Sequence, residues 1–202
     1  MVDESMISSL IDEVQLWWHS LPSYLRSSGL AEPSYFRSIC YIGLRYNYAL
    51  MLITRRHLLQ TLVSRGRCSE EVLSRARVCE EAHDRSTIII RDMASKDMIS
   101  QLIWFDSLFL FCNVNLTAVR CFQRSKPSQA HASQICEFVP ILETVRRNSQ
   151  GKWKKRALDY VIGFSKALQQ DLDYIDAQSK YGTFLFILLK LANCLQPQNL
   201  SH

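Results

Sequence analysis

The side chains that most often bind metals occur here in two short groups on predicted helices. Cys79 and His83 are four residues apart, so both lie on one helix face and could form half of a metal site. Asp171, Asp173 and Asp176 lie within "DLDYID", and the last two share a face that could hold magnesium. No second motif accompanies either group. We therefore interpret the first as a core cysteine beside a partly exposed histidine, and the second as a solvated face.

The sequence contains none of the motifs that mark common catalytic or cofactor sites. It has no CxxC pair, no HExxH helix and no GxSxG elbow, and its six glycines are too dispersed to form a phosphate-binding loop. We therefore expect no catalytic residues, no metal ligands and no cofactor within this chain, and predict that it is not an enzyme.

Two further groups of side chains could contact a ligand or partner. An apolar ligand pocket could be lined by aromatic residues, namely Trp17, Trp18, Trp104, Phe105, Phe109 and Phe111, with Trp104, Phe105 and Phe109 as the main candidates, although aromatic residues at helical spacing more often belong to a core. The segment "RRNSQGKWKKR" forms a candidate basic patch, which consists of Arg146, Arg147, Lys152, Lys154, Lys155 and Arg156. Such a patch attracts anionic partners in a salt-dependent way, whereas the alternative is a solvated turn between two helices.

Composition excludes several classes of protein. The chain has 202 residues with 48% hydrophobic residues and a net charge of +5, which is typical of a folded domain. Seven cysteines, an odd number, favour free thiols in a reducing compartment over a disulfide framework. The start lacks the pattern of a signal peptide. The most apolar segment, Leu102 to Val119, contains Asp106, Asn113 and Asn115, so we expect no membrane span.

Hydrophobic periodicity predicts an all-α protein, a bundle of about six to seven helices that forms a single domain over residues 1–202. Low glycine and proline content agrees with this, because sheets and turns consume both. The predicted helices cover about 2–19, 33–63, 69–97, 98–124, 130–148, 152–176 and 184–195. The second is expected to begin at Pro33, and the third to use Ser69 as its N-cap. Residues 196–202 read as a frayed tail.

The long helix predicted after Pro33 combines apolar spacing with polar-tipped residues. In "ICYIGLRYNYALMLITRRHLL" we expect Tyr46 and Arg55 to be buried and to hydrogen-bond to neighbouring helix ends or carboxylates. They would then act as structural polar clips between helices. The alternative is that they form part of a binding site.

The same segment resembles the fungus-specific transcription factor domain, which is the regulatory or middle homology region of fungal binuclear zinc-cluster transcription factors. In that family a Trp and an "LP..L" link precede a long helix, as in "LWWHSLPSYLR" and "IGLRYNYALMLITRRHLL" here. The matching positions of the long helix are Ile42, Leu44, Tyr46, Leu52, Arg55 and Leu58 or Leu59. Arg56 departs from the pattern, because the family usually has proline there. "RVCEEAHDRSTIII", "IWFDSLFLFCNVNLTAV" and "LETVRRNSQGKWKKRALDYVIGFSKAL" follow in the family's order.

The resemblance implies a regulatory, non-catalytic helical domain, the carboxy-terminal half of such a region or a truncated relative. It implies a nuclear protein that modulates transcription through partners of the transcription machinery, a homodimer partner or a small effector. The family's zinc cluster needs six cysteines in a spacing that this chain lacks, so zinc is expected only in an upstream module. The chain itself is therefore expected not to bind DNA sequence-specifically.

Two other classes of function stay open on the sequence alone. One is a stand-alone helical ligand-binding domain or metabolic enzyme fragment, with an apolar pocket around Trp104, and the other is a dimerisation or scaffold domain with exposed apolar helix faces. Neither has a role on DNA, and both would be expected in the cytoplasm.

Overall fold

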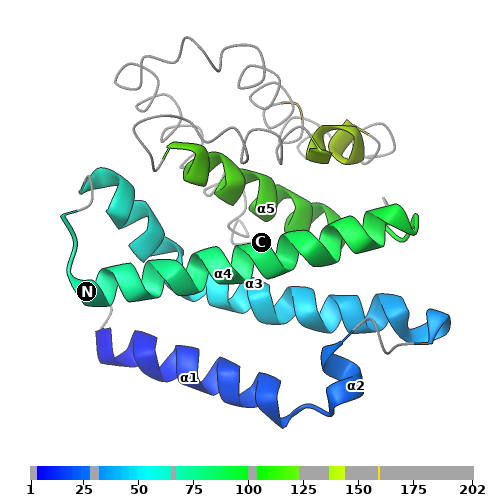
Figure 1. Cartoon of the computed structure of the whole chain (residues 1–202), viewed down its shortest axis with the longest axis horizontal. Coiled ribbons are helices and arrows are strands. Elements are labelled where there is room, and N and C mark those ends of the chain that lie inside the picture. Colours follow the sequence, from blue (N-terminus) through cyan, green and yellow to red (C-terminus); the bar gives the residue numbers. More distant parts are fainter. Residues whose placement is uncertain are drawn as a thin grey trace, which may run out of the picture. The chain divides into compact units, whose positions relative to one another are not determined.

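The computed structural model describes residues 4–27, 32–64, 67–99, 104–122, 137–143 and 159. The elements that it describes are helices α1 to α5 and a further helical segment at 137–143, and no strand occurs among these residues (Figure 1). The prediction of an all-α bundle is therefore confirmed. The predicted helices at 152–176 and 184–195, and the tail at 196–202, lie outside this description apart from residue 159.

The chain divides into two compact units, residues 1–113 and 114–202, and α5 contributes to both. The prediction of one domain over residues 1–202 stays a prediction, because much of the second unit lies outside the described residues. In that unit the described part of the core consists of Val114, Thr117, Val119, Phe138 and Leu142. The described residues cover nearly all of the first unit, which contains the pocket and the three polar clusters of the next subsection.

Helix α1 spans Glu4–Ser20 and corresponds to the helix predicted at 2–19. It buries only Ile7 and Ile11 fully, so most of its surface faces solvent. A single turn, α2 (Ser23–Arg26), follows between the two helices predicted at 2–19 and 33–63, where no helix was predicted. It forms because Pro22 has φ −52°, which suits a helix start, and its carbonyl accepts a hydrogen bond from Leu25 N at 3.0 Å.

Helix α3 spans Pro33–Val63, as predicted. Proline is tolerated at the first helical position because the N–H that it lacks would have no partner in the helix. The Glu32 carbonyl accepts the first bonds, from Tyr35 N at 2.9 Å and Phe36 N at 3.1 Å. The first hydrogen bonds of α3 are therefore formed by backbone groups, and Pro33 already has the φ that a helix needs.

Helix α4 spans Glu70–Ser95 and is capped at both ends. The Ser69 hydroxyl accepts a hydrogen bond from Val72 N, which confirms the predicted N-cap. At the other end, Met98 N donates to Met93 O at 2.8 Å and Asp97 N donates to Ala94 O at 3.1 Å. This is a Schellman motif, and it places Asp97 in the left-handed region with φ 52°.

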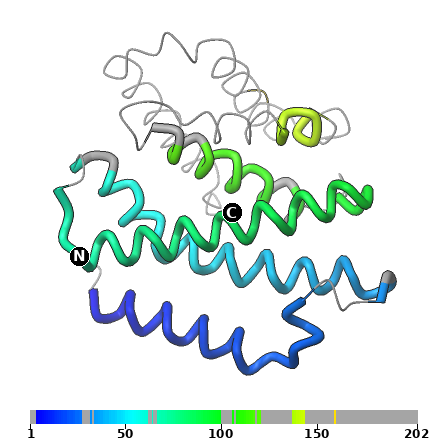
Figure 2. Tube along the Cα trace, in the orientation of Figure 1, coloured from blue at the N-terminus to red at the C-terminus, as the bar shows by residue number. Residues whose placement is uncertain are grey.

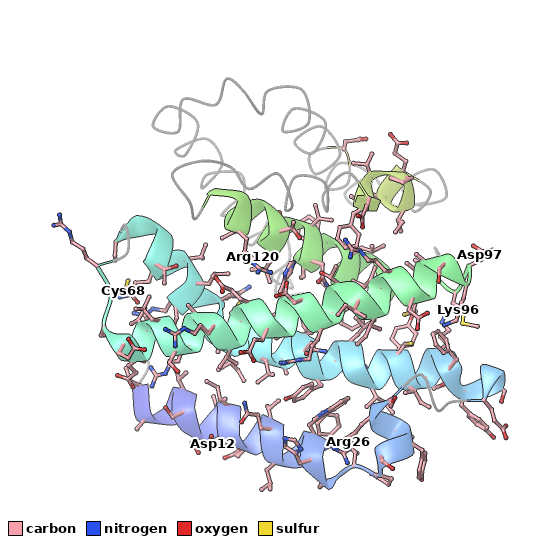
Figure 3. All side chains as sticks on the ribbon, viewed as in Figure 1. Asp12, Arg26, Cys68, Lys96, Asp97 and Arg120 are labelled. Carbon is pink, nitrogen blue, oxygen red and sulfur yellow. The ribbon has the colours of Figure 1, made fainter. Side chains whose placement is uncertain are left out.

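Helices α3 and α4 run antiparallel and pack closely on each other, and α1 packs along α3 (Figures 1 and 2). Side chains from these helices fill the space between the ribbons (Figure 3). The core of the first unit is formed by Ile7, Ile11, Phe36, Ile39, Cys40, Leu44, Tyr46, Leu50, Met51, Leu58, Ala76, Cys79, Ala82, Ile90, Met93, Phe109, Leu110 and Phe111.

Helix α5 spans Trp104–Phe122, inside the range 98–124 predicted for it. Its first half carries Asp106 and Asn113, which are both buried and both contact α3 or α4. No helix among the described residues is long and apolar enough to cross a membrane.

Candidate functional site: a pocket between α1, α3 and α4

A pocket of about 520 Å³ lies between α1, α3 and α4, with α2 at its rim. This volume falls within the range of about 300–1,000 Å³ that is typical of sites for small organic ligands. Its apolar wall includes Ile39, Val78, Ile88 and Ile89. The lining also contains aromatic, amide and charged groups, so it offers orientation as well as apolar contact.

An aromatic stack joins α1 to α3 at this pocket. The rings of Trp18 and Tyr46 are 4.4 Å apart between centroids and only 14° from parallel. Tyr46 is 7% exposed, and Trp18 is half-buried. Burial is the main reason why the pKa of the Tyr46 hydroxyl is raised. The Tyr46 phenol therefore stays neutral, and its ring stacks on Trp18.

A polar chain runs from α3 to α4 next to this stack. The Asn47 side chain donates from Nδ2 to Gly43 O at 2.8 Å and accepts at Oδ1 from Arg85 Nε at 3.0 Å. The Arg85 guanidinium also lies over the Tyr46 ring, 6.0 Å from its centroid. Asn47 is 2% exposed, so the amide that positions Arg85 is itself held by the fold.

Gly43 forms part of the pocket lining where α1, α3 and α4 meet. A methyl group at this position would lie 2.9 Å from Ile89 Cδ1 and 3.9 Å from Trp18 Cη2. The absence of a side chain thus keeps space between these two residues. An isolated glycine within a helical pattern is a sequence signal for such a close approach. Gly43 was not among the predicted site residues.

Cys40 borders the same pocket but is not suited to nucleophilic chemistry. It is a free thiol with 1% exposure, and burial raises its pKa to about 11. The nearby Asp92 carboxylate acts in the same direction. Because the thiolate is the reactive form, this thiol is inert near neutral pH.

A second polar cluster fixes the start of α1 to α4. Arg75 is 5% exposed and forms ion pairs with Glu4 and Glu71. Its Nη2 also donates to Glu4 O at 3.0 Å and to Ser8 Oγ at 2.9 Å. His57 of α3 is next to it, with Nε2 at 3.3 Å from Glu4 Oε2. The cluster connects three helices and lies outside the pocket lining.

A third cluster connects α3 to the first half of α5. Asp106 is 4% exposed and accepts from Arg37 Nη2 at 2.9 Å and from the Tyr41 hydroxyl. Burial and this bond to the carboxylate raise the pKa of Tyr41 to about 12. The acidic residue that argued against a membrane span is thus a buried ion-pair partner.

The prediction for Cys79 and His83 holds for the cysteine and is wrong for the histidine. Cys79 is a buried free thiol. His83 is fully buried, with Nε2 at 3.1 Å from Asn113 O and Nδ1 at 3.5 Å from Asp84 Oδ1. Within the described residues no group of three or more metal-ligating side chains could hold an ion. Asp171, Asp173 and Asp176 lie outside the described residues.

The predicted clip residues Tyr46 and Arg55 have different environments. Tyr46 is buried as expected, and its contacts are the stack with Trp18 and the Arg85 guanidinium. Arg55 is exposed, so the prediction that it is a buried clip was wrong. The two residues are nine positions apart, which at about 100° per residue places them on opposite sides of one helix. The buried arginine that connects helices is Arg75, which the sequence reading missed.

The remaining predicted sites are only partly covered by the described residues. Phe109 is 1% exposed and packs edge-on against Tyr48, with centroids 5.7 Å apart, so it is a core residue. The side chains of Trp104 and Phe105 lie outside the description. The same is true of the candidate basic patch, Arg146, Arg147, Lys152, Lys154, Lys155 and Arg156.

Comparisons of the chain with protein-family models, curated proteins and solved structures find no match.

Proposed function

We propose that this chain is a regulatory, non-catalytic helical domain of a fungal transcription factor, which modulates transcription through protein partners or a small effector. The observation that carries the proposal is the contact between Trp18 and Tyr46. These residues belong to the two segments that most resemble the fungus-specific transcription factor domain, the link region and the long helix. Their rings meet at a pocket of about 520 Å³.

The environments of the buried titratable groups also favour a non-catalytic role. Arg75, Asp106 and His83 all have partners that connect helices to one another. Cys40 is a buried neutral thiol. Such groups stabilise a fold, whereas catalysis needs a base or nucleophile that reaches a substrate.

The proposal is tested by fusing the whole chain to an unrelated DNA-binding domain and measuring transcription of a reporter gene. We expect transcription to differ from that of the DNA-binding domain alone. Trp18→Ala should alter this effect, because it removes the stack at the pocket. Leu16→Ala is the matched control, since Leu16 is an apolar residue of α1 that is 71% exposed and lies outside the pocket lining. Circular dichroism verifies that both variants fold. Unchanged reporter transcription for the wild-type fusion would contradict the proposal.

The pocket also favours a second candidate, a stand-alone ligand-binding domain with no role on DNA. The ligand-binding candidate is supported by the size and lining of the pocket and does not depend on the family resemblance. The mass and zinc content of the native polypeptide distinguish the two. A native polypeptide much larger than 23.4 kDa that contains zinc supports the transcription factor. A zinc-free polypeptide of about this mass supports the stand-alone domain.

A further inference from the structure

We propose that the pocket between α1, α3 and α4 binds a small organic monocarboxylate with an apolar body. The inference deepens the small-effector branch of the proposed function and rests on it for its biological role. Its physical basis is the composition of the pocket lining, which combines apolar side chains with two arginines and one glutamate.

The apolar part of the lining can receive the body of the ligand. Ile39, Val78 and Ile89 contribute aliphatic surface from α3 and α4, and the stacked rings of Trp18 and Tyr46 contribute aromatic surface. Stacked aromatic rings offer a large rigid contact surface, and little side-chain entropy is lost when a ligand packs on them. The pocket therefore favours an apolar group over a fully polar metabolite.

The charged part of the lining favours a carboxylate. Arg85 and Arg26 contribute two guanidinium groups, against the single carboxylate of Glu81. Arg85 is oriented by its Nε bond to Asn47 Oδ1 at 3.0 Å, which fixes the plane of the guanidinium. Its Nη1 is 3.6 Å from Glu81 Oε2, which is longer than a hydrogen bond. The guanidinium thus retains N–H donors for a second carboxylate, and arginine binds carboxylates with two parallel bonds.

The balance of charge selects the class of ligand. Two guanidinium groups and one carboxylate leave an excess of one positive charge, which a monoanion neutralises. A cationic ligand would be repelled by both arginines. A phosphate dianion would leave an excess of one negative charge beside Glu81, where like charges repel, although solvent weakens this effect because the Arg85 and Glu81 side chains are 45% and 67% exposed.

The test measures binding of matched acid and amide pairs to the full chain. Benzoate, 2-naphthoate, indole-3-acetate and decanoate are compared with their primary amides, first by thermal shift and then by calorimetry. At least one acid should bind with one-to-one stoichiometry, about tenfold or more tightly than its amide, because a charge-assisted pair replaces a neutral hydrogen bond. If no acid binds more tightly than its amide, the proposal is overturned.

Variants locate the binding site. Arg85→Gln should weaken the acid about tenfold and leave the amide nearly unchanged, since glutamine can still donate to Asn47. The control is Arg77→Gln, which removes an arginine of α4 whose side chain is 65% exposed and which lies outside the pocket lining. Gly43→Ala places a methyl group between Ile89 and Trp18 and should weaken both members of a pair. Equal losses in Arg85→Gln and Arg77→Gln would overturn the proposal.

The outcomes separate this inference from the proposed function. Acid binding that depends on Arg85, together with an unaffected reporter, would support the pocket and reject the regulatory role. A regulated reporter without selective acid binding would support the regulatory role and reject the carboxylate.

Discussion

Arg75 shows how a charged side chain is accommodated inside a helical core. Its guanidinium is buried, whereas the carboxylates of Glu4 and Glu71 are 49% and 61% exposed. The acids therefore keep much of their hydration while they neutralise the arginine, and the Glu4 carbonyl and Ser8 hydroxyl accept further hydrogen bonds from its Nη2. This arrangement avoids most of the desolvation cost that a fully buried ion pair has.

Replacing Arg75 by methionine should lower the free energy of unfolding by about 2 kcal/mol, because several charge-assisted hydrogen bonds are lost while the apolar stem is kept. Urea denaturation followed by circular dichroism measures the change. Arg77→Met on the same helix is the control and should change it by less than about 0.5 kcal/mol, since that side chain is 65% exposed. Equal effects of the two substitutions would mean that the Arg75 contacts contribute nothing specific.

His57 makes stability depend on pH. Burial lowers its pKa below the ordinary value of 6.5. The Glu4 carboxylate beside it does not reverse this, because Arg75 already neutralises that carboxylate. As pH falls through about 6.5, the unfolded chain binds a proton at this position more readily than the folded chain does, so stability falls with pH in this window.

We therefore expect the free energy of unfolding to decrease between about pH 7.5 and about pH 5.5, and to decrease less in His57→Gln. Denaturation at both pH values measures the difference in slope. Gln60→Ala is the control, because Gln60 is an exposed residue of α3 whose side chain does not titrate. A His57→Gln slope equal to that of the wild type would show that His57 does not carry this dependence.

At the scale of elements, the signals that set helix ends were readable from local sequence. Pro33 and Ser69 act through their own backbone and side chain, so neighbouring residues suffice to predict them. Which face of α3 is buried was harder to read. Its exposed side carries the apolar Leu52, 41% exposed, among Arg45, Arg55 and Arg56, so residue type alone does not separate the buried face from the exposed one.

The site itself could be predicted only in part. Tyr46 was singled out correctly as a buried polar-tipped residue, but its partner Trp18 is 28 residues away and on another helix. Arg75 meets Glu4 across 71 positions. Periodicity along one helix carries no information on such pairs, because they depend on how helices pack.

The end of α4 provides a test at this scale. Asp97 adopts φ 52°, a conformation that glycine adopts without strain and aspartate adopts at a cost. Asp97→Gly should raise the free energy of unfolding by about 0.5–1 kcal/mol, and Asp97→Ala should lower it. Thermal and urea denaturation distinguish the two. If glycine and alanine have the same effect, the left-handed conformation does not limit stability.

At the scale of the whole molecule, every residue that lines the pocket belongs to the first compact unit. A fragment of residues 1–122, which ends where α5 ends, should therefore fold and keep the ligand selectivity of the full chain. Circular dichroism and the same acid and amide pairs provide the measurement. The result expected is a cooperative helical unfolding transition and an unchanged preference for acid over amide. A fragment that folds but loses the preference would place the binding site elsewhere.

Helix α1 buries only Ile7 and Ile11, and is otherwise held by Arg75 at its start and by the Trp18–Tyr46 stack near its end. Because α1 forms one wall of the pocket, partial release of this helix would remove contacts that hold a ligand there. Glu4 lies about 20 Å along the helix from Trp18. A substitution at Glu4 that loosens α1 would then shorten the lifetime of the complex without touching the ligand, so residence time would be set far from the contacts that set selectivity.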